Sequence, residues 1–176
     1  MKRTLMTLVG MTLLGLPAAA RASDAESSVR IGSDQRGTAT ADAAARYDGE
    51  IGFARTQTRS GNITLARGVA VGFDQEGLSL SLSNGVATRS GLAVATNFNL
   101  SIGSDGRVSG SSGNVVSAGT AYRAAETGGS TSTRRAAPAI SFAAGRSDPA
   151  GQVRADTRAW TRPSIRYSAP LRIYRR

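Results

Sequence analysis

The sequence predicts an all-β fold, a single antiparallel domain of roughly eight to ten short strands. Three observations indicate it. Apolar and small polar residues alternate with a period of two through most of the chain, helical periodicity is nearly absent after the amino terminus, and turns rich in Asp and Gly separate the alternating stretches. Strand order leaves no local mark in a sequence, so a sandwich, an open meander and an irregular solenoid all stay open.

The first element is a secretory signal over residues 1–22, expected as a helix. Two basic residues precede an apolar stretch from Leu5 to Leu16, which is too short to cross a bilayer. The small residues Ala20 and Ala22 predict cleavage before Ser23. We therefore expect an exported protein, in the periplasm, on the cell surface or outside the cell.

A flexible N-terminal segment is expected over residues 23–45, followed by a β-rich body over residues 46–123. The stretch from Thr40 to Tyr47 is the best candidate for a short helix, because it contains three consecutive alanines. Within the body, each predicted strand has one apolar face and one face of Ala, Ser, Asn or Gly. These strands begin at Ile51 and include residues 63–73, 78–83 and 92–102, with a bulge expected at Gly68.

Asp and Gly mark the turns between these strands. Asn84-Gly85 predicts a tight hairpin, because both residues tolerate positive φ. Residues 34–37, 74–77 and 148–151 each begin with Asp and end with Gly, which is typical of a type I turn. Residues 58–61 and 88–91 also share the sequence Thr-Arg-Ser-Gly, so we interpret the chain as reusing one hairpin device.

The carboxyl-terminal part divides into a Gly/Ser/Thr linker over residues 124–137 and an arginine-rich hairpin or arm over residues 138–176. Ten arginines and two acids fall between Ser130 and Arg176, whereas charges nearly balance in the preceding residues from Ser23. In an extended arm, the arginines share one face and the apolar residues share the other. Arginine forks suit anionic groups and aromatic rings stack on bases or sugars, so this arm is the candidate site for a polyanion. Its candidate residues are Arg154, Arg158, Trp160, Arg162, Arg166, Tyr167, Arg172, Tyr174, Arg175 and Arg176.

Composition argues against an enzyme. The chain contains no Cys and no His, and its single Lys is Lys2, inside the signal, so the usual bases, thiolates and Schiff-base amines are missing. Asp48 with Glu50 and Asp74 with Glu76 are too few carboxylates for a calcium loop, and we interpret them as turn residues. We expect no cofactor, no metal and no small-molecule substrate.

Three functions are compatible with these observations. The first is an exported structural or adhesion-type surface protein that self-associates through β-strands, with Asn97 and Asn99 forming ladders between copies. The second is a secreted module that binds a polyanion or an anionic envelope surface through its Arg/aromatic arm. The third is a small outer-membrane β-barrel, suggested by ten-residue alternating strands and weakened by the scarcity of aromatic residues.

Overall fold

The fold consists of ten antiparallel strands in two sheets, which confirms the all-β prediction. The computed structural model describes residues 22–34, 36, 38–134, 139–148 and 151–162. The expected signal helix lies outside these residues, and so does the arm from residue 163 onward. No helix among the described residues is long and apolar enough to span a membrane.

The smaller sheet has four strands in the order β2-β1-β8-β9. β1 (Asp24–Asp34) and β2 (Ala39–Asp48) form a hairpin, and so do β8 (Tyr122–Ser132) and β9 (Ile140–Asp148). β1 pairs with β8, so this sheet joins strands from the two ends of the described chain.

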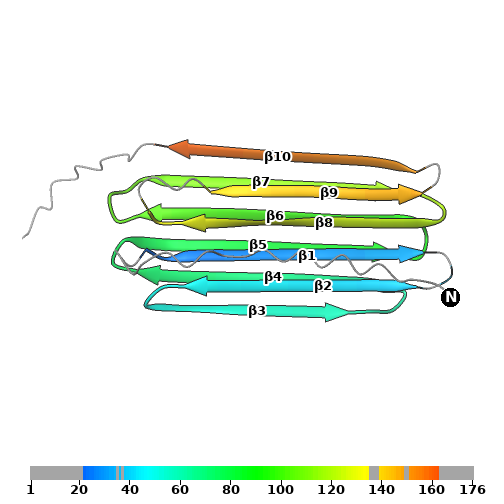
Figure 1. Cartoon of the computed structure of the whole chain (residues 1–176), viewed down its shortest axis with the longest axis horizontal. Helices are drawn as coiled ribbons and strands as arrows, with labels where there is room; N and C mark the ends of the chain where they lie inside the picture. The colour runs from blue at the N-terminus through cyan, green and yellow to red at the C-terminus, as the bar shows by residue number, and fades with distance from the viewer. Residues whose placement is uncertain (1–21, 35, 37, 135–138, 149–150, 163–176) are drawn as a thin grey trace, which may run out of the picture.

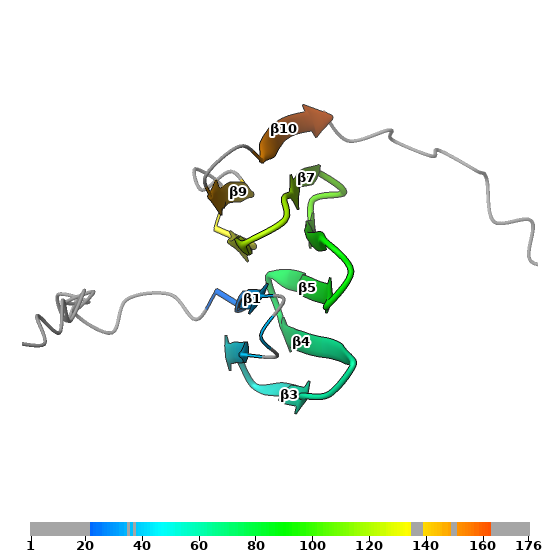
Figure 2. The ribbon, with the colours of Figure 1, turned by 90° about the vertical axis from the view of Figure 1, so that its right-hand side faces the viewer.

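The larger sheet has six strands in the order β10-β7-β6-β5-β4-β3. Five of them form a continuous meander: β3 (Ile51–Arg59), β4 (Ile63–Asp74), β5 (Gly77–Thr88), β6 (Leu92–Gly103) and β7 (Val108–Ala118). β10 (Gln152–Arg162) completes the sheet by pairing with β7. Figure 1 shows the strands of both layers running nearly along one direction, and Figure 2 shows the layers end-on with β3 and β10 at the two ends of the larger one.

The interior between the sheets is lined by small side chains, many of them polar. Ser79, Ser81 and Ser83 of β5 are fully buried and face β1. Ser27 of β1 meets the hydroxyls of both Ser81 and Ser83, at 2.8 and 2.9 Å. The hydroxyls of these three β5 serines thus find partners across the layers, which offsets the cost of removing them from water.

Asn97 and Asn99 of β6 also lie in this interior. The Asn99 side-chain amide donates to the Ser141 hydroxyl at 2.9 Å and to the Ile140 carbonyl at 3.2 Å, both on β9. The Asn97 amide donates to the Gly128 and Phe142 carbonyls. These residues therefore join the two sheets of one chain, and the expectation that they form ladders between copies is wrong.

Apolar residues occupy the other half of the interior, toward the turns that follow β3 and β5. Val29 and Ile31 of β1 are its largest members, and they pack against Val115 and small alanines of the larger sheet. Arg123 closes this end. It is fully buried, and its guanidinium donates to the carbonyls of Thr88, Arg89, Gly119 and Ala121.

Two glycines predicted to interrupt strands instead lie inside them. β5 runs straight through Asn84-Gly85, so the predicted hairpin turn there is wrong, and the chain reverses after Thr88. The register of β4 is continuous through Gly68, so the predicted bulge is also absent. Both positions face the other sheet: a Cβ at Gly68 would lie 2.6 Å from the Ala44 carbonyl oxygen, and one at Gly85 would lie 3.2 Å from Ile31 Cγ2. Glycine is therefore needed here for close packing of the layers and not for a turn.

Three predictions for the terminal segments, which rested on their composition, are also wrong. The segment expected to be flexible, residues 23–45, contains β1 and most of β2, and the expected helix from Thr40 lies in β2. Most of the expected Gly/Ser/Thr linker is β8, because a strand facing this interior needs small residues: a Cβ at Gly129 would lie 2.2 Å from the Asn99 side-chain nitrogen, on β6 of the other sheet. β9 and β10 do not pair with each other, so the expected hairpin of the arm is a crossing from one sheet to the other.

The predicted turn at residues 74–77 is confirmed, and a similar turn follows β6. Asp74 Oδ1 accepts the backbone N–H groups of Glu76 and Gly77 at 2.8 and 3.1 Å. Asp105 Oδ1 accepts the N–H of Arg107 in the same manner. Neighbouring turns are joined by backbone hydrogen bonds, from Ser104 N to the Glu76 carbonyl at one end of the sheet and from Gly119 N to the Gly91 carbonyl at the other.

Candidate functional site

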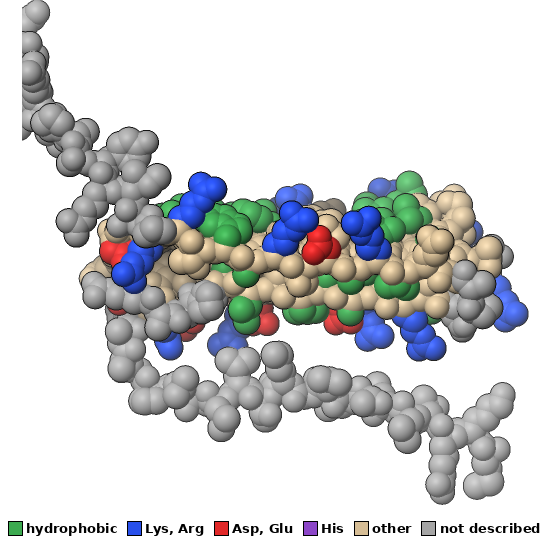
Figure 3. Space-filling model, turned by 90° about the horizontal axis from the view of Figure 1, so that it is seen from above, with side chains coloured by type: hydrophobic (Ala, Val, Ile, Leu, Met, Phe, Trp, Pro, Cys, Tyr) green, Lys and Arg blue, Asp and Glu red, His purple; other side chains and the backbone are tan. Residues whose placement is uncertain are grey.

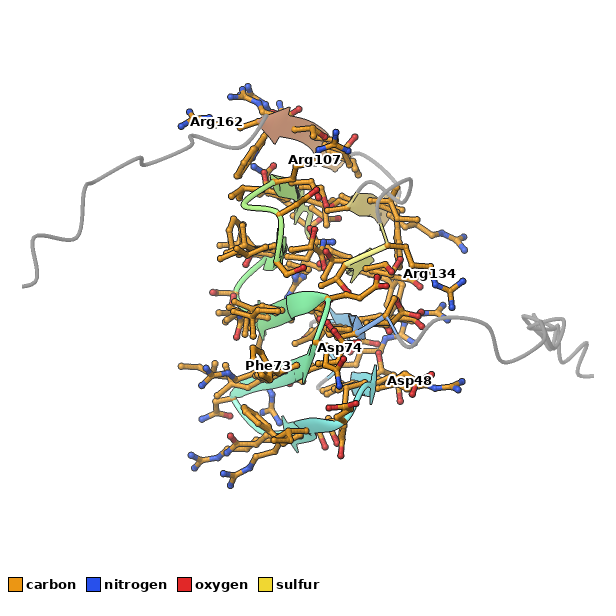
Figure 4. All side chains as sticks on the ribbon, turned by 90° about the vertical axis from the view of Figure 1, so that its left-hand side faces the viewer. Asp48, Phe73, Asp74, Arg107, Arg134 and Arg162 are labelled. Atoms are coloured by element: carbon orange, nitrogen blue, oxygen red, sulfur yellow. The ribbon has the colours of Figure 1, made fainter. Side chains whose placement is uncertain are left out.

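The outer face of the larger sheet is apolar. Because side chains alternate along a strand, the faces of β5 and β6 that carry Ser, Ala and Asn point inward and their Leu, Val, Ile and Phe side chains point to solvent. Figure 4 shows the same division on β4, where Phe73 points away from the smaller sheet and Asp74 lies between the layers. Six large side chains of this face, between 37% and 55% exposed, are Ile63, Leu65, Phe73, Leu92, Phe98 and Ile102.

Arginines border this apolar face along β10. Arg154, Arg158 and Arg162 share the outer side of the strand with Trp160, as the alternation in the sequence predicts. The Trp160 ring lies over Gly110 of β7, where a Cβ would come within 2.4 Å of a ring atom, and Arg162 lies 5.6 Å from the ring centroid. Figure 3 looks onto this edge, with basic side chains spaced along it and an acidic one between them. Asp156 of β10 lies 3.4 Å from Arg158 in an exposed ion pair that contributes little stability.

A second border of arginines lies on β3, at the opposite edge. Arg55 and Arg59 lie on the outer side of this strand, in line with Ile51 and Phe53. Sequence reasoning did not single them out, although their odd numbering places them on the apolar face of the strand. Arg67 of β4 lies between the two borders, in a row of polar residues that crosses the face.

The strands that form the two edges of this sheet are exposed on both faces. Nearly every residue of β3 and β10 is exposed, because the smaller sheet is two strands narrower and leaves them uncovered. Each pairs on one side only, β3 with β4 and β10 with β7. Their other backbone edges are therefore unpaired within the described residues.

The structure thus places four of the predicted polyanion-binding residues on one strand face: Arg154, Arg158, Trp160 and Arg162. Arg166, Tyr167, Arg172, Tyr174, Arg175 and Arg176 lie outside the described residues, as does Ala20 of the predicted cleavage site. Ala22 is buried, and the backbone N–H of Ser23 donates to Thr133 Oγ1 at 2.9 Å.

Two further observations bear on the chemistry of the molecule. Among the described residues, no group of three or more acidic side chains could hold a metal ion. Comparisons of the chain with protein-family models, with characterised proteins and with solved structures found no match. The fold and the site define a class only: a two-layer antiparallel β-protein with one apolar outer face bordered by arginine.

Proposed function

We propose that the chain is an exported, non-enzymatic structural protein of the adhesion type, which assembles through the free edges of its larger sheet. The observation that carries this proposal is the exposure of β3 and β10. They have 9 and 11 residues, longer than the strands of about five or six residues common in globular proteins, and each leaves a row of backbone N–H and C=O groups unpaired. Such an edge is a template for another chain.

The geometry of the sheet favours a repeating assembly. β3 and β10 are the first and last strands of an antiparallel sheet with an even number of strands, so they run in opposite directions. A second copy displaced sideways by one sheet width would place its β10 antiparallel to β3 of the first. Such a contact joins two different surfaces and leaves the same two free at the ends, which generates a filament and not a closed dimer.

Two of the features that usually protect an edge are missing from these strands. Neither β3 nor β10 contains Pro, and their inward positions are Gly, Ala, Thr and Val, with no charge among them. The small twist between neighbouring strands, which run nearly along one direction (Figure 1), supports the proposal, because untwisted sheets are typically stabilised by stacking or by side-chain ladders.

Proline substitution on β3 tests the proposal. Backbone N–H groups of adjacent residues in a strand point to opposite sides, so either Thr56→Pro or Gln57→Pro removes an N–H from the free edge while the other breaks the ladder to β4. The variant that keeps the melting temperature of the parent identifies the outward N–H. We expect that variant to form fewer and shorter oligomers, measured by size-exclusion chromatography with light scattering on residues 23–176, which contain all ten strands.

Thr56→Ala and Gln57→Ala are the matched controls, because they change the same side chains and keep both N–H groups. They should assemble like the parent chain. A parent chain that stays strictly monomeric at high concentration would overturn the proposal, and so would assembly unaffected by the tolerated proline.

A further inference from the structure

The apolar face of the larger sheet is larger than a soluble monomer usually exposes. With strands about 4.8 Å apart and residues about 3.3 Å apart along them, six strands cover roughly 25 by 35 Å. That area is comparable with the ~800 Å² that each partner buries in a stable complex. Its largest side chains gather over the serine-rich half of the interior, where Phe73, Leu78 and Ile102 form one row across three strands. Covering these side chains is favourable, because it removes their apolar surface from water.

Rows across the sheet end in arginine on both sides. One row runs from Arg158 through Ser112, Phe98, Leu82 and Val69 to Arg55. Another runs from Arg154 through three valines and Leu65 to Arg59, with the valines at 86, 94 and 116. The polar row between these two contains Arg67 and Asp156. Asp156 is the only acid among the strand residues of the outer face.

Two aromatic residues lie at the same borders. Trp160 on β10 and Phe53 on β3 end a single row whose middle is Leu100, Leu80 and Val71. Apolar areas on the two sides of the polar row, bordered by tryptophan and arginine, match the interface of a lipid leaflet, where acyl chains lie beside headgroups and amphipathic side chains contact both.

We propose that this face binds the surface of an anionic lipid leaflet. The six arginines and one acid of the face would meet lipid phosphates, while the aliphatic rows between them enter the acyl boundary. Arg67, which has no ion-pair partner among the described residues, would reach a headgroup from the middle of the face.

Charge decides against a second copy as the occupant. Two copies stacked on this face by a twofold axis along the strands would place β3 over β10, with Arg55 over Arg158. A twofold axis across the strands would place each arginine border over the same border of the other copy. Both arrangements bring like charges together around a desolvated centre, which is costly.

The smaller sheet presents a different outer face. Acids and arginines lie side by side on it: Glu26 is opposite Arg46, and Arg30 is opposite Asp42, on β1 and β2. Its alternating charges and small residues offer no comparable attraction for an anionic surface. The chain would therefore lie with one defined side toward the lipid, and its free sheet edges would remain in the plane of the leaflet.

Vesicle binding tests the proposal. Residues 23–176 should sediment with vesicles of phosphatidylcholine containing 30% phosphatidylglycerol and remain in solution with phosphatidylcholine alone, with binding that weakens as salt is raised. The triple variant Arg154→Gln/Arg158→Gln/Arg162→Gln should bind about a hundredfold more weakly, since basic residues near an anionic surface each contribute to the attraction. Phe73→Ser should weaken binding as well.

Matched controls lie on the smaller sheet. Arg30→Gln/Arg46→Gln/Arg146→Gln removes the same charge, and Phe142→Ser removes an aromatic side chain 46% exposed, close to the 52% of Phe73. Both should bind vesicles like the parent chain. The tolerated β3 proline should bind too, because it leaves the face unchanged, which separates this inference from edge assembly.

Three outcomes would overturn the inference: equal binding to neutral and anionic vesicles, equal loss in the controls on the smaller sheet, or no binding at low salt. Retention on heparin with no effect of Phe73→Ser on any binding would assign the arginines to a soluble polyanion instead.

Discussion

At the scale of single residues, Arg123 is the most constrained side chain of the fold. It is fully buried and donates to four carbonyls that belong to the turns after β5 and β7. Its charge satisfies backbone groups that would otherwise be left without partners at the closed end of the interior. This end of the molecule therefore depends on one guanidinium.

Replacing Arg123 should destabilise the fold. We expect Arg123→Met to lower the free energy of unfolding by at least about 2 kcal/mol, because several buried carbonyls lose their donor. Arg123→Lys should recover only part of the loss, since an ammonium lacks the planar fork. Urea denaturation measures both, with Arg89→Met as an exposed control on the neighbouring turn. Equal stability of the Arg123 and Arg89 variants would contradict this role.

The turn after β1 contains a hydrogen bond that depends on the ionisation of the Asp34 carboxyl. The backbone N–H of Thr38 donates to Asp34 Oδ1 at 2.8 Å, and this hydrogen bond holds the pKa of the carboxyl below its usual value. A carboxyl whose pKa is lower in the folded state stabilises the fold above its unfolded pKa and loses that contribution as the pH falls through the folded pKa. NMR titration should show the Asp34 carboxyl and the Thr38 amide moving together at acidic pH. In Asp34→Asn, the Thr38 amide should not follow that titration.

At the scale of elements, the contact between β1 and β5 determines how closely the two sheets approach. Ser81 illustrates it: its hydroxyl contacts Ser27 and donates to Asn99 Oδ1 at 2.6 Å and to the Gly129 carbonyl at 3.1 Å. No larger side chain could occupy this position without separating the layers.

Two substitutions at Ser81 distinguish the stability that comes from its hydrogen bonds from the effect of the distance between the sheets. Ser81→Ala should cost about 1–3 kcal/mol, because its partners lose a hydrogen bond in a buried site. Ser81→Leu should cost more and should also broaden the NMR signals of β1 and β8, because it forces the sheets apart. Ser112→Leu on the outer face of β7 is the control and should be close to neutral. A stable, well-ordered Ser81→Leu variant would show that the interior tolerates a conventional apolar core.

The strands were largely predictable from the sequence, whereas their environment was not. Alternation located β4, β5 and β6, and it placed Arg154, Arg158 and Arg162 on one face of β10. Alternation does not say which face is buried, because Ser and Asn can satisfy each other across a dry interface as well as bind water. The Gly and Ser of β8 likewise resemble a linker until the partner sheet is known, and Gly85 resembles a turn until Ile31 is placed against it. Arg55 and Arg59 could not be assigned to the candidate site from the sequence, because the position of β3 at the edge of the sheet leaves no local mark.

At the scale of the whole molecule, the arginines of β3 and β10 affect the proposed assembly through the sheet edges. A joint between β10 and β3 would bring together five arginines and Asp156 on one outer face. Their repulsion opposes assembly at low ionic strength, so edge pairing should strengthen as salt screens it.

Light scattering at increasing sodium chloride tests this balance. Oligomer size should rise with salt, and sulfate should act more strongly than chloride at equal ionic strength, because guanidinium groups bind the divalent oxyanion. In Arg154→Gln/Arg158→Gln/Arg162→Gln, assembly should depend much less on salt. Oligomers that dissociate as salt is raised would show that attraction between charges, and not backbone pairing, holds the copies together.

The polar interior also has a thermal consequence. The heat capacity increase on unfolding comes from newly exposed apolar surface and is reduced by newly exposed polar surface. Here serines and asparagines fill much of the interior, and many of the large aliphatic side chains already meet solvent before unfolding. Calorimetry on the monomer should therefore give a heat capacity change below the usual value of about 12–15 cal/mol/K per residue. The curve of stability against temperature is then shallow, so this fold should resist cold nearly as well as it resists moderate heat.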